Sequence, residues 1–508
     1  MTSTDKRFIL ALDQGTTSSR AILFDSSGMP FASAHCEFTQ HTPAPGIVEH
    51  DPEEIWQSQL TSARIVLEKA GVVASMIAGI GVTNQRETTI LWDRHTGTAV
   101  APAIVWQSRV SAPLCEQFRE AGFEEEIRKR TGLVLDPYFS ATKIRHLLDT
   151  IPGLRARCES GDVLFGTVDT FLLWRLSGGL LHITDPTNAS RTMLYDIVDG
   201  AWSDQLCEKL GVPRCILPSI RSSSEVYGMC ESKWFGAEIP LAGCAGDQQS
   251  AAYGQGCISA GQAKNTYGTG AFLFFATGSD CIESQHGLLT SRACDVGGAS
   301  QYCLEGSVFI AGAVVGWLRD GLGIIQTSAE VESLALRVSQ TDGVVFVPAL
   351  TGLGAPHWDP YARGLLIGLS RGTTAAHIAR AALEAIAFQV CDIVSAMQSD
   401  SGSTLQTLRV DGGASANNLL MQMQADLLGV PVERPCVVET TALGAALLAG
   451  RAVGFFDDSE ALEARKIERI FLPNMDSKVR AHMLSRWHEA VDRSRRWESP
   501  HGDGLTPA

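Results

Sequence analysis

The fold is decided by the polar stretch Asp13-Gln14-Gly15-Thr16-Thr17-Ser18-Ser19-Arg20, which the apolar runs Phe8–Leu12 and Ala21–Phe24 enclose. Two short β-prone runs around a glycine-containing polar turn predict a β-hairpin. Gly15 lets a ligand approach the backbone because glycine has no Cβ, and successive N–H groups with hydroxyls form an anion site. The stretch therefore predicts either a phosphate-binding hairpin, with Asp13 placed to hold Mg²⁺, or an ordinary polar turn.

A similar pattern recurs in the second half of the chain. Asn265-Thr266-Tyr267-Gly268-Thr269-Gly270 precedes the apolar run Ala271–Phe275. This weak internal repeat predicts two related halves that face each other across a nucleotide. A third glycine-rich turn, Asp411–Asn418, joins a predicted strand at Leu405–Val410 to a predicted helix at Leu419–Leu428. A turn of this kind admits a flat base, or a phosphate at the helix N-terminus.

Length and composition indicate a large globular protein. A chain of 508 residues is too long for one ordinary core, so we expect two large domains. Its 45% hydrophobic and 19% charged residues are sufficient for well-packed cores with a polar surface. The net charge of −15 argues against nucleic acid or an anionic membrane as a partner, because both attract basic surfaces. The net charge does not argue against a phosphorylated ligand, since a local site of N–H groups and one or two arginines is enough to bind a phosphate.

Cysteine usage and hydropathy point to the cytoplasm. The 13 cysteines show no Cys-x-x-Cys spacing, so the sequence predicts neither a disulfide framework nor a zinc site. No charged and then apolar signal segment opens the chain. The longest run of small apolar residues, Thr441–Gly450, is too short to span a bilayer. We therefore expect a cytoplasmic protein without membrane insertion.

Charged residues follow two predicted buried strands. Ile77–Val82 leads to Arg86 and Glu87, and Ile239–Gly246 leads to Asp247. Binding residues of α/β sheets gather at the carboxyl ends of strands. Arg86 and Glu87 can donate to and accept from a polyhydroxy ligand, or they can form a surface ion pair. Asp247 can act as the general base for a substrate hydroxyl, as the N-cap of a helix that starts at Gln248, or as both.

Other segments are predicted from local signals. Asp51 precedes Pro52 and predicts the N-cap of a helix. Trp106 is either a hydrophobic wall for a small ligand or core, and the phenol of Tyr138 could meet a ligand hydroxyl. Further predictions are a polar loop at Thr184–Thr192, a long helix at Thr373–Gln398 with a surface histidine, His377, and a charged surface helix at Ser477–Trp497.

Together the motifs resemble those of the FGGY carbohydrate kinases, in the actin, hexokinase and Hsp70-like superfamily. The stretch from Asp13 to Arg20 looks like their first phosphate motif, Asn265–Gly270 like the second, and Asp411–Asn418 like the adenosine motif. Gly364–Leu369 and the residues that follow it resemble the C-terminal signature. The resemblance extends over nearly the whole chain.

The resemblance implies an α/β fold of two ribonuclease-H-like domains, residues 1–254 and 255–508, with ATP in the cleft between them. Four stretches are similar to the family members that phosphorylate glycerol: Gly81–Thr88, Asp136–Ser140, Phe165–Thr170 and Ala245–Gln249. The implied reaction is direct in-line transfer from ATP to glycerol, giving sn-glycerol 3-phosphate and ADP, with Mg²⁺ as cofactor in a homodimer or homotetramer. A kinase for another polyol or sugar, and a non-catalytic ATP-dependent switch, are the alternatives.

The resemblance also implies roles for individual residues. Asp247 matches the general base and Asp13 the carboxylate on the metal side. Glycerol would be held by Arg86, Glu87, Tyr138, Asp247 and Gln248, against an apolar wall of Trp106 and Phe272. The phosphates would be bound by Thr16, Thr17, Ser18, Arg20 and Thr269, and the nucleoside would lie near Gly312, Gly413 and Asn417.

Three positions depart from the pattern of the family. Gly316 stands where many members carry a glutamine on the nucleotide side, and His357 replaces a more usual tyrosine. Residues 229–236 lack both the glycine-rich, arginine-containing loop that senses fructose 1,6-bisphosphate and the histidine that is phosphorylated in some members. We therefore expect both of these controls to be absent.

Overall fold

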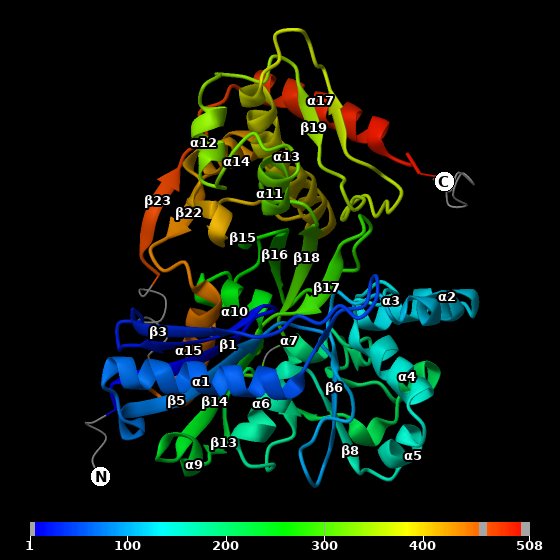
Figure 1. The fold of residues 1–508 in the computed structure, drawn as a ribbon, viewed down its shortest axis with the longest axis vertical. Coiled ribbons are helices and arrows are strands. Elements are labelled where there is room, and N and C mark those ends of the chain that lie inside the picture. The colour runs from blue at the N-terminus through cyan, green and yellow to red at the C-terminus, as the bar shows by residue number, and fades with distance from the viewer. Residues whose placement is uncertain (1–5, 299, 457–464, 499–508) are drawn as a thin grey trace.

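The computed structural model describes residues 6–298, 300–456 and 465–498, and it contains two α/β halves, each built around a mixed sheet (Figure 1). The first sheet has the strand order β13-β14-β5-β1-β2-β3. Its strands are β1 (Phe8–Gln14), β2 (Ser18–Phe24), β3 (Pro30–Glu37), β5 (Ile77–Asn84), β13 (Ser224–Cys230) and β14 (Ile239–Gly246). The second sheet has the order β17-β18-β16-β15-β21-β22-β23. Its strands are β15 (Ala263–Tyr267), β16 (Ala271–Gly278), β17 (Leu289–Arg292), β18 (Tyr302–Val308), β21 (Leu408–Asp411), β22 (Val432–Pro435) and β23 (Ile467–Phe471).

Helices surround both sheets, and short strands pair outside them. The α-helices are α1 (Pro52–Ala70), α2 (Ala112–Glu120), α3 (Glu124–Thr131), α4 (Ser140–Thr150), α5 (Leu154–Glu159), α6 (Val168–Leu176), α7 (Pro186–Ala189), α8 (Asp204–Leu210), α9 (Ser232–Phe235), α10 (Asp247–Gly254), α11 (Gly312–Asp320), α12 (Glu330–Ala335), α13 (Ala375–Ser401), α14 (Asn418–Leu428), α15 (Thr440–Ala452) and α17 (Ser477–Ser494). The short strands are β4 (Glu49–His50), β6 (Ile90–Asp93), β7 (Ala103–Ile104), β8 (Val163–Gly166), β9 (Ile183–Thr184), β10 (Tyr195–Asp196), β11 (Ala201–Trp202), β12 (Ser219–Ile220), β19 (Val345–Val347) and β20 (Leu365–Ile367).

The two sheets share one topology. In the first, β1 pairs antiparallel with β2 and parallel with β5, which pairs parallel with β14. In the second, β15 pairs antiparallel with β16 and parallel with β21, which pairs parallel with β22. These four strands are flanked on both sides by antiparallel strands, β13 and β3 in the first sheet and β18 and β23 in the second. Strand β17 extends the second sheet beyond β18. The internal repeat predicted from the two Gly/Thr turns is confirmed.

The two hairpins begin each repeat, as predicted. Asp13 pairs with Arg20 across the first hairpin, so the turn Gly15–Thr17 lies at the end of β1 and β2. Tyr267 pairs with Ala271 across the second, which leaves the turn Gly268–Gly270 at the corresponding end. The structure therefore presents both predicted phosphate turns at the ends of paired strands.

The two halves each contribute a helix to the other. Helix α15 lies between β22 and β23 of the second sheet in sequence but packs on the first, where Ala442 and Ala446 meet Ile9 and Ala242 (Figure 1). Helix α10 follows the last strand of the first sheet, and its Ala252 joins a small apolar cluster on the second sheet. The two helices also pack on each other. The relative position of the sheets therefore depends on this helix pair.

Glycines allow the close contact between α10 and α15. A Cβ on Gly444 would lie 1.8 Å from the carbonyl oxygen of Ser250, and one on Gly254 would lie 2.3 Å from that of Thr440. Side chains cannot occupy such positions without moving a backbone. The two helices are therefore in contact through their main chains.

We expect Gly444→Ala to destabilise the protein by about 1–3 kcal/mol or more, because the added methyl group overpacks a backbone contact. Gly316→Ala is the matched control: it also lies within a helix, but no atom comes within 4 Å of its added Cβ. Because alanine has a higher helix propensity than glycine, the stability of Gly316→Ala should equal that of the wild type or exceed it by up to about 1 kcal/mol. Thermal unfolding followed by circular dichroism measures both, and equal midpoints would contradict the packing argument.

Several local predictions can be compared with the structure. The N-cap at Asp51 is confirmed, since its side chain accepts from the N–H of Glu53. The loop predicted at 184–192 is wrong: this segment contains α7 and is buried. His377 is not a surface residue, because it is 7% exposed and completes a capping box with Thr374. None of the helices in the described residues is long and apolar enough to cross a membrane.

Candidate active site

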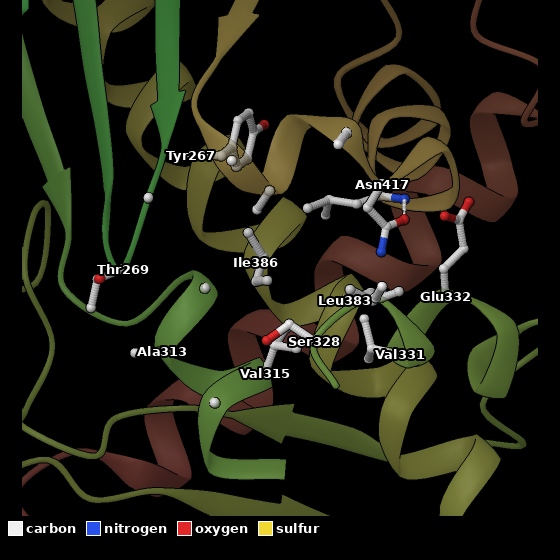
Figure 2. A pocket seen from close by; sticks show the side chains of 18 of the residues that line it. Tyr267, Thr269, Ala313, Val315, Ser328, Val331, Glu332, Leu383, Ile386 and Asn417 are labelled. Atoms are coloured by element: carbon white, nitrogen blue, oxygen red, sulfur yellow. Dashed lines mark hydrogen bonds between the residues drawn. The ribbon is translucent and has the colours of Figure 1, made fainter. Parts of the chain in front are cut away.

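A cavity of about 580 Å³ lies in the second half of the chain. Its lining includes four residues predicted for the nucleotide, namely Thr269, Gly312, Gly413 and Asn417. Thr269 lies at one end, Asn417 and Glu332 lie at the other, and apolar side chains such as Leu383 stand between them (Figure 2). An apolar middle with polar ends suits a flat base together with its sugar and phosphates.

Glycines form the wall of this cavity near the second phosphate turn. The N–H of Gly312 donates to the carbonyl of Gly268 at 2.9 Å, and a Cβ on Gly312 would lie 2.5 Å from that oxygen. Gly412, with φ +84°, packs against the backbone of Tyr267 in the same way. Gly312 and Gly412 therefore allow their two chain segments to pack against the segment of Tyr267 and Gly268, beside the cavity.

The first phosphate turn lies at the edge of the other half. Thr17 is exposed, and Thr16, Ser18 and Arg20 are half-buried. The Arg20 guanidinium forms an ion pair with Glu439, the residue that precedes α15. Its remaining N–H groups are still available to an anion. The turn thus combines free backbone and hydroxyl donors with one cation.

Asp13 lies beside this turn in a group of acidic side chains. Burial raises the pKa of Asp13 to about 7; Arg20 opposes the shift, and Glu439 and Asp247 add to it. A carboxyl group among other carboxylates, with one nearby arginine, is a favourable oxygen donor for a divalent cation. The residues present therefore fit Mg²⁺.

A buried histidine is linked to the first turn through one glutamine side chain. His50 is fully buried and forms a 2.7 Å hydrogen bond with Gln40, whose Nε2 donates to the carbonyl of Thr16 at 2.8 Å. Burial, with a contribution from His41, lowers the pKa of His50 to about 4. The folded protein therefore holds this imidazole neutral at pH values where the unfolded chain would protonate it.

The free energy of unfolding should consequently decrease as the pH falls from 6.5 towards 4, because the unfolded state binds the additional proton. We expect the wild type to lose up to about 1.4 kcal/mol per pH unit more than His50→Gln in this range. His482→Gln is the control, since His482 is exposed on α17, and it should keep the wild-type slope. Urea unfolding at several pH values measures the three slopes; parallel curves for wild type and His50→Gln would refute the assignment.

Arg86 is the centre of the predicted acceptor site. It does not form a surface ion pair, because its side chain is 3% exposed and that of Glu87 is 2% exposed. Its Nε lies 3.1 Å from the Asp247 carboxylate. Its Nη1 donates to Glu305 at 2.7 Å and to Gln249 at 3.0 Å. One guanidinium therefore contacts side chains of both halves of the molecule.

Glu87 has an unusual backbone that neighbouring side chains stabilise. Its φ of +59° lies in the left-handed region, which is rare for a residue with a Cβ. Its carbonyl accepts from the hydroxyl of Ser140 at 3.0 Å and from Lys143 at 3.2 Å. Its carboxylate forms an ion pair with Arg191. Such strain is typical of residues that are held in place for binding.

Aromatic rings border the same site. The ring centroids of Trp106 and Tyr138 are 5.6 Å apart, and Arg191 lies over the ring of Tyr138 at 5.2 Å. Burial raises the pKa of the Tyr138 phenol, so it remains a hydroxyl donor. The indole N–H of Trp106 donates to the Thr16 hydroxyl at 3.0 Å. Trp106 therefore links the predicted acceptor site to the phosphate turn.

Asp247 and Gln248 lie at the start of α10. The helix begins at Asp247 itself and its cap is Gly246, so Asp247 is not the predicted N-cap. The Asp247 side chain is 35% exposed, in contrast to Arg86. Lys264 donates to the Gln248 oxygen at 2.5 Å. Because an ammonium group only donates, this contact fixes the amide and leaves its NH₂ for a ligand.

The structure thus brings the predicted acceptor residues close to the first predicted phosphate turn. The predicted nucleotide cavity lies apart from both. Arg86, Glu87 and Asp247 are in contact, and Trp106 connects Tyr138 with Thr16. The predicted nucleotide cavity is lined by Tyr267, among others, which lies three residues or about 10 Å along β15 from Lys264. Phe272 lies on β16, where it pairs with Thr266, and its contact with a ligand stays a prediction.

Three site residues were missed from the sequence: Arg191, Lys264 and Glu305. Arg191 lies in the segment predicted to be a polar loop. Glu305 lies within β18, whose other residues are largely apolar, whereas Lys264 lies within β15, which mixes apolar and polar residues. A charged residue inside a largely apolar strand is rarely buried without a partner, so this signal could have identified Glu305 but not Lys264.

The duplicated sheets, with a glycine-rich turn at the start of each repeat, define a two-domain α/β protein with a kinase fold. Residues 8–254 match the N-terminal domain, and residues 263–453 the C-terminal domain, of the FGGY family of carbohydrate kinases. The chain belongs to this family.

Similar proteins extend over almost the whole chain. It is 56% identical to glycerol kinase 2 of Thermotoga maritima over 97% of this chain and 99% of that protein. It is 54% identical to glycerol kinase of Deinococcus radiodurans, again over 97% and 99%. The solved structure of Plasmodium falciparum glycerol kinase with ADP is similar at a TM-score of 0.91 and 37% identity, covering 96% of this chain and 98% of that one. Xylulose kinase from Lactobacillus acidophilus, at 22% identity and a TM-score of 0.86 over 96% and 97%, shares the fold.

Proposed function

We propose that this protein transfers the γ-phosphoryl group of ATP to glycerol and releases sn-glycerol 3-phosphate and ADP. The observation that carries the proposal is the acceptor site, in which Asp247 is accessible and Arg86 and Glu87 are almost fully buried behind it. Side chains at this depth favour a small acceptor over a large one. The two relatives reported above at more than 50% identity are both named glycerol kinases and support the same substrate.

The nucleotide assignment rests on the cavity and the two turns. The adenosine would occupy the cavity lined by Gly312, Gly413 and Asn417, and the phosphates would extend past Thr269 towards the first turn. There Thr16, Thr17, Ser18 and Arg20 would supply hydroxyl, backbone and guanidinium donors. Phosphoryl transfer needs this positioning and charge stabilisation more than covalent assistance.

Asp13 would hold Mg²⁺ on the phosphate side of the site. Bound there, the cation would neutralise negative charge on the transferring phosphates. Burial is the main cause of the raised pKa of Asp13, and Glu439 and Asp247 add to it; these two neighbours support the assignment, because a cation would offset the repulsion among the carboxylates. Asp13 then provides a carboxylate oxygen and leaves Asp247 free for the acceptor.

Asp247 would act on the glycerol hydroxyl. The hydroxyl oxygen attacks the γ-phosphorus, the bond to the bridging oxygen of ADP breaks, and the hydroxyl proton passes to the Asp247 carboxylate. An aspartate is a weak base for an alcohol, but in a loose transition state the proton leaves late, so good placement suffices. Arg86, at 3.1 Å from Asp247, would fix the orientation of this carboxylate.

The first test is ADP release from MgATP in a coupled assay, with glycerol and a panel of polyols and sugars. Glycerol should support a rate well above that without an acceptor, since the burial of Arg86 and Glu87 favours a small acceptor. A larger sugar as the best acceptor would overturn the substrate assignment. ATP binding without any acceptor-dependent rate would instead indicate a switch of the actin or Hsp70 kind.

Asp247→Asn should lower turnover with glycerol by about 10²-fold or more, because the amide cannot take the proton. The affinity for ADP, measured by calorimetry, should change by less than about threefold, since the adenosine cavity lies in the other half of the molecule. Full turnover in this variant would remove Asp247 as the base.

The remaining assignments complete this proposal. A glycerol kinase of this composition would work in the cytoplasm, where its 13 cysteines stay reduced. We further propose that it forms a homo-oligomer. Size-exclusion chromatography with light scattering measures the number of chains in the assembly.

A further inference from the structure

Glu305 brings a negative charge from the second half of the molecule into the acceptor site. It lies on β18 and its side chain is 7% exposed. One carboxylate oxygen accepts from Arg86 at 2.7 Å. The other accepts from Gln249 at 3.1 Å and lies 3.4 Å from Arg191. Burial alone would raise the pKa of Glu305, but Arg86 and Arg191 together lower it to about 2.

The two arginines that Glu305 joins contact the residues proposed to bind glycerol. Arg86 reaches Asp247, and Arg191 forms an ion pair with Glu87 and lies over the ring of Tyr138. A guanidinium presents its donors in a rigid fork, so fixing one edge fixes the direction of the other. Glu305 therefore determines how both arginines face the site.

Resting on the function proposed above, we propose that Glu305 is a positioning residue for the acceptor: it holds Arg86 and Arg191 from the second domain, so that glycerol affinity depends on the contact between the domains. Glu305 does not face the adenosine cavity, whose lining is made of other residues. Its removal should therefore affect the two substrates unequally. A residue that only stabilises the fold would not produce this difference.

The test compares Glu305→Gln with the wild type. The amide lacks the charge and one of the two acceptor oxygens, so we expect the KM for glycerol to rise at least tenfold. The KM for ATP and the calorimetric affinity for ADP should stay within about twofold. Arg191→Lys is a second variant, which keeps the charge but loses the fork, and it should shift the glycerol KM in the same direction.

Glu433→Gln is the matched control. Glu433 lies on β22 of the same sheet and also stands between two arginines, at 3.7 Å from Arg409 and 2.7 Å from Arg465. These residues do not line the adenosine cavity or contact the acceptor group described here. The control variant should lose a comparable charge network and keep the wild-type KM for both substrates.

A double-mutant cycle tests whether Glu305 acts through Arg86. The glycerol KM of the double variant Arg86→Lys, Glu305→Gln should rise by clearly less than the product of the two single effects, because the part of the Glu305 effect that passes through Arg86 is already lost in Arg86→Lys, and the part that passes through Arg191 remains. If the KM increases of the two single variants multiply in the double variant, Glu305 does not act through Arg86. An unchanged glycerol KM in Glu305→Gln, or an equal loss of ADP affinity, would overturn the inference itself. If wild type prefers another acceptor to glycerol, the proposed function fails, and the same comparison with that acceptor still tests Glu305.

Discussion

The main-chain contact between α10 and α15 is the constraint on which the rest of the structure depends. Gly254 and Gly444 let the two helices approach closely, and each helix covers a sheet. The same helices begin at the site: Asp247 is the first residue of α10, and Glu439, the partner of Arg20, precedes α15. The position of the proposed base relative to the phosphate turn is therefore set by backbone packing and not by flexible side chains.

Charge is buried at the acceptor site in a way that favours a preformed pocket. Arg86, Arg191, Glu87 and Glu305 are each less than a tenth exposed and neutralise one another across the domain boundary. Leaving any one of these charges without a partner would be costly, so the group has few alternative arrangements. A small polar ligand would then meet donors and acceptors whose directions are already fixed, which lowers the ordering cost of binding.

Local patterns in the sequence predict the hairpins, the strand ends and most of the proposed site. The turns at Gly15 and Gly268 were predictable because their signals lie within a few residues, and Asp247 because it directly follows a strand. The contacts of Glu305 could not be predicted, since this residue lies 219 residues from Arg86 and 114 residues from Arg191 in the sequence. Likewise the polar composition of segment 184–192 predicts a loop, and this prediction is wrong because its polar residues are satisfied by partners, such as Ser223 and Gly246, that only the fold brings near.

The exchange of helices between the halves has a consequence for dissecting this protein. A fragment that ends at residue 254 would contain the complete first sheet but not α15, and the face formed by Ile9, Ala11 and Ile22 would be open to water. The complementary fragment would lack α10 and expose Phe274 and Cys303. Although the sequence divides into two similar units, each half completes the other's core, and the natural unit of expression is the undivided chain.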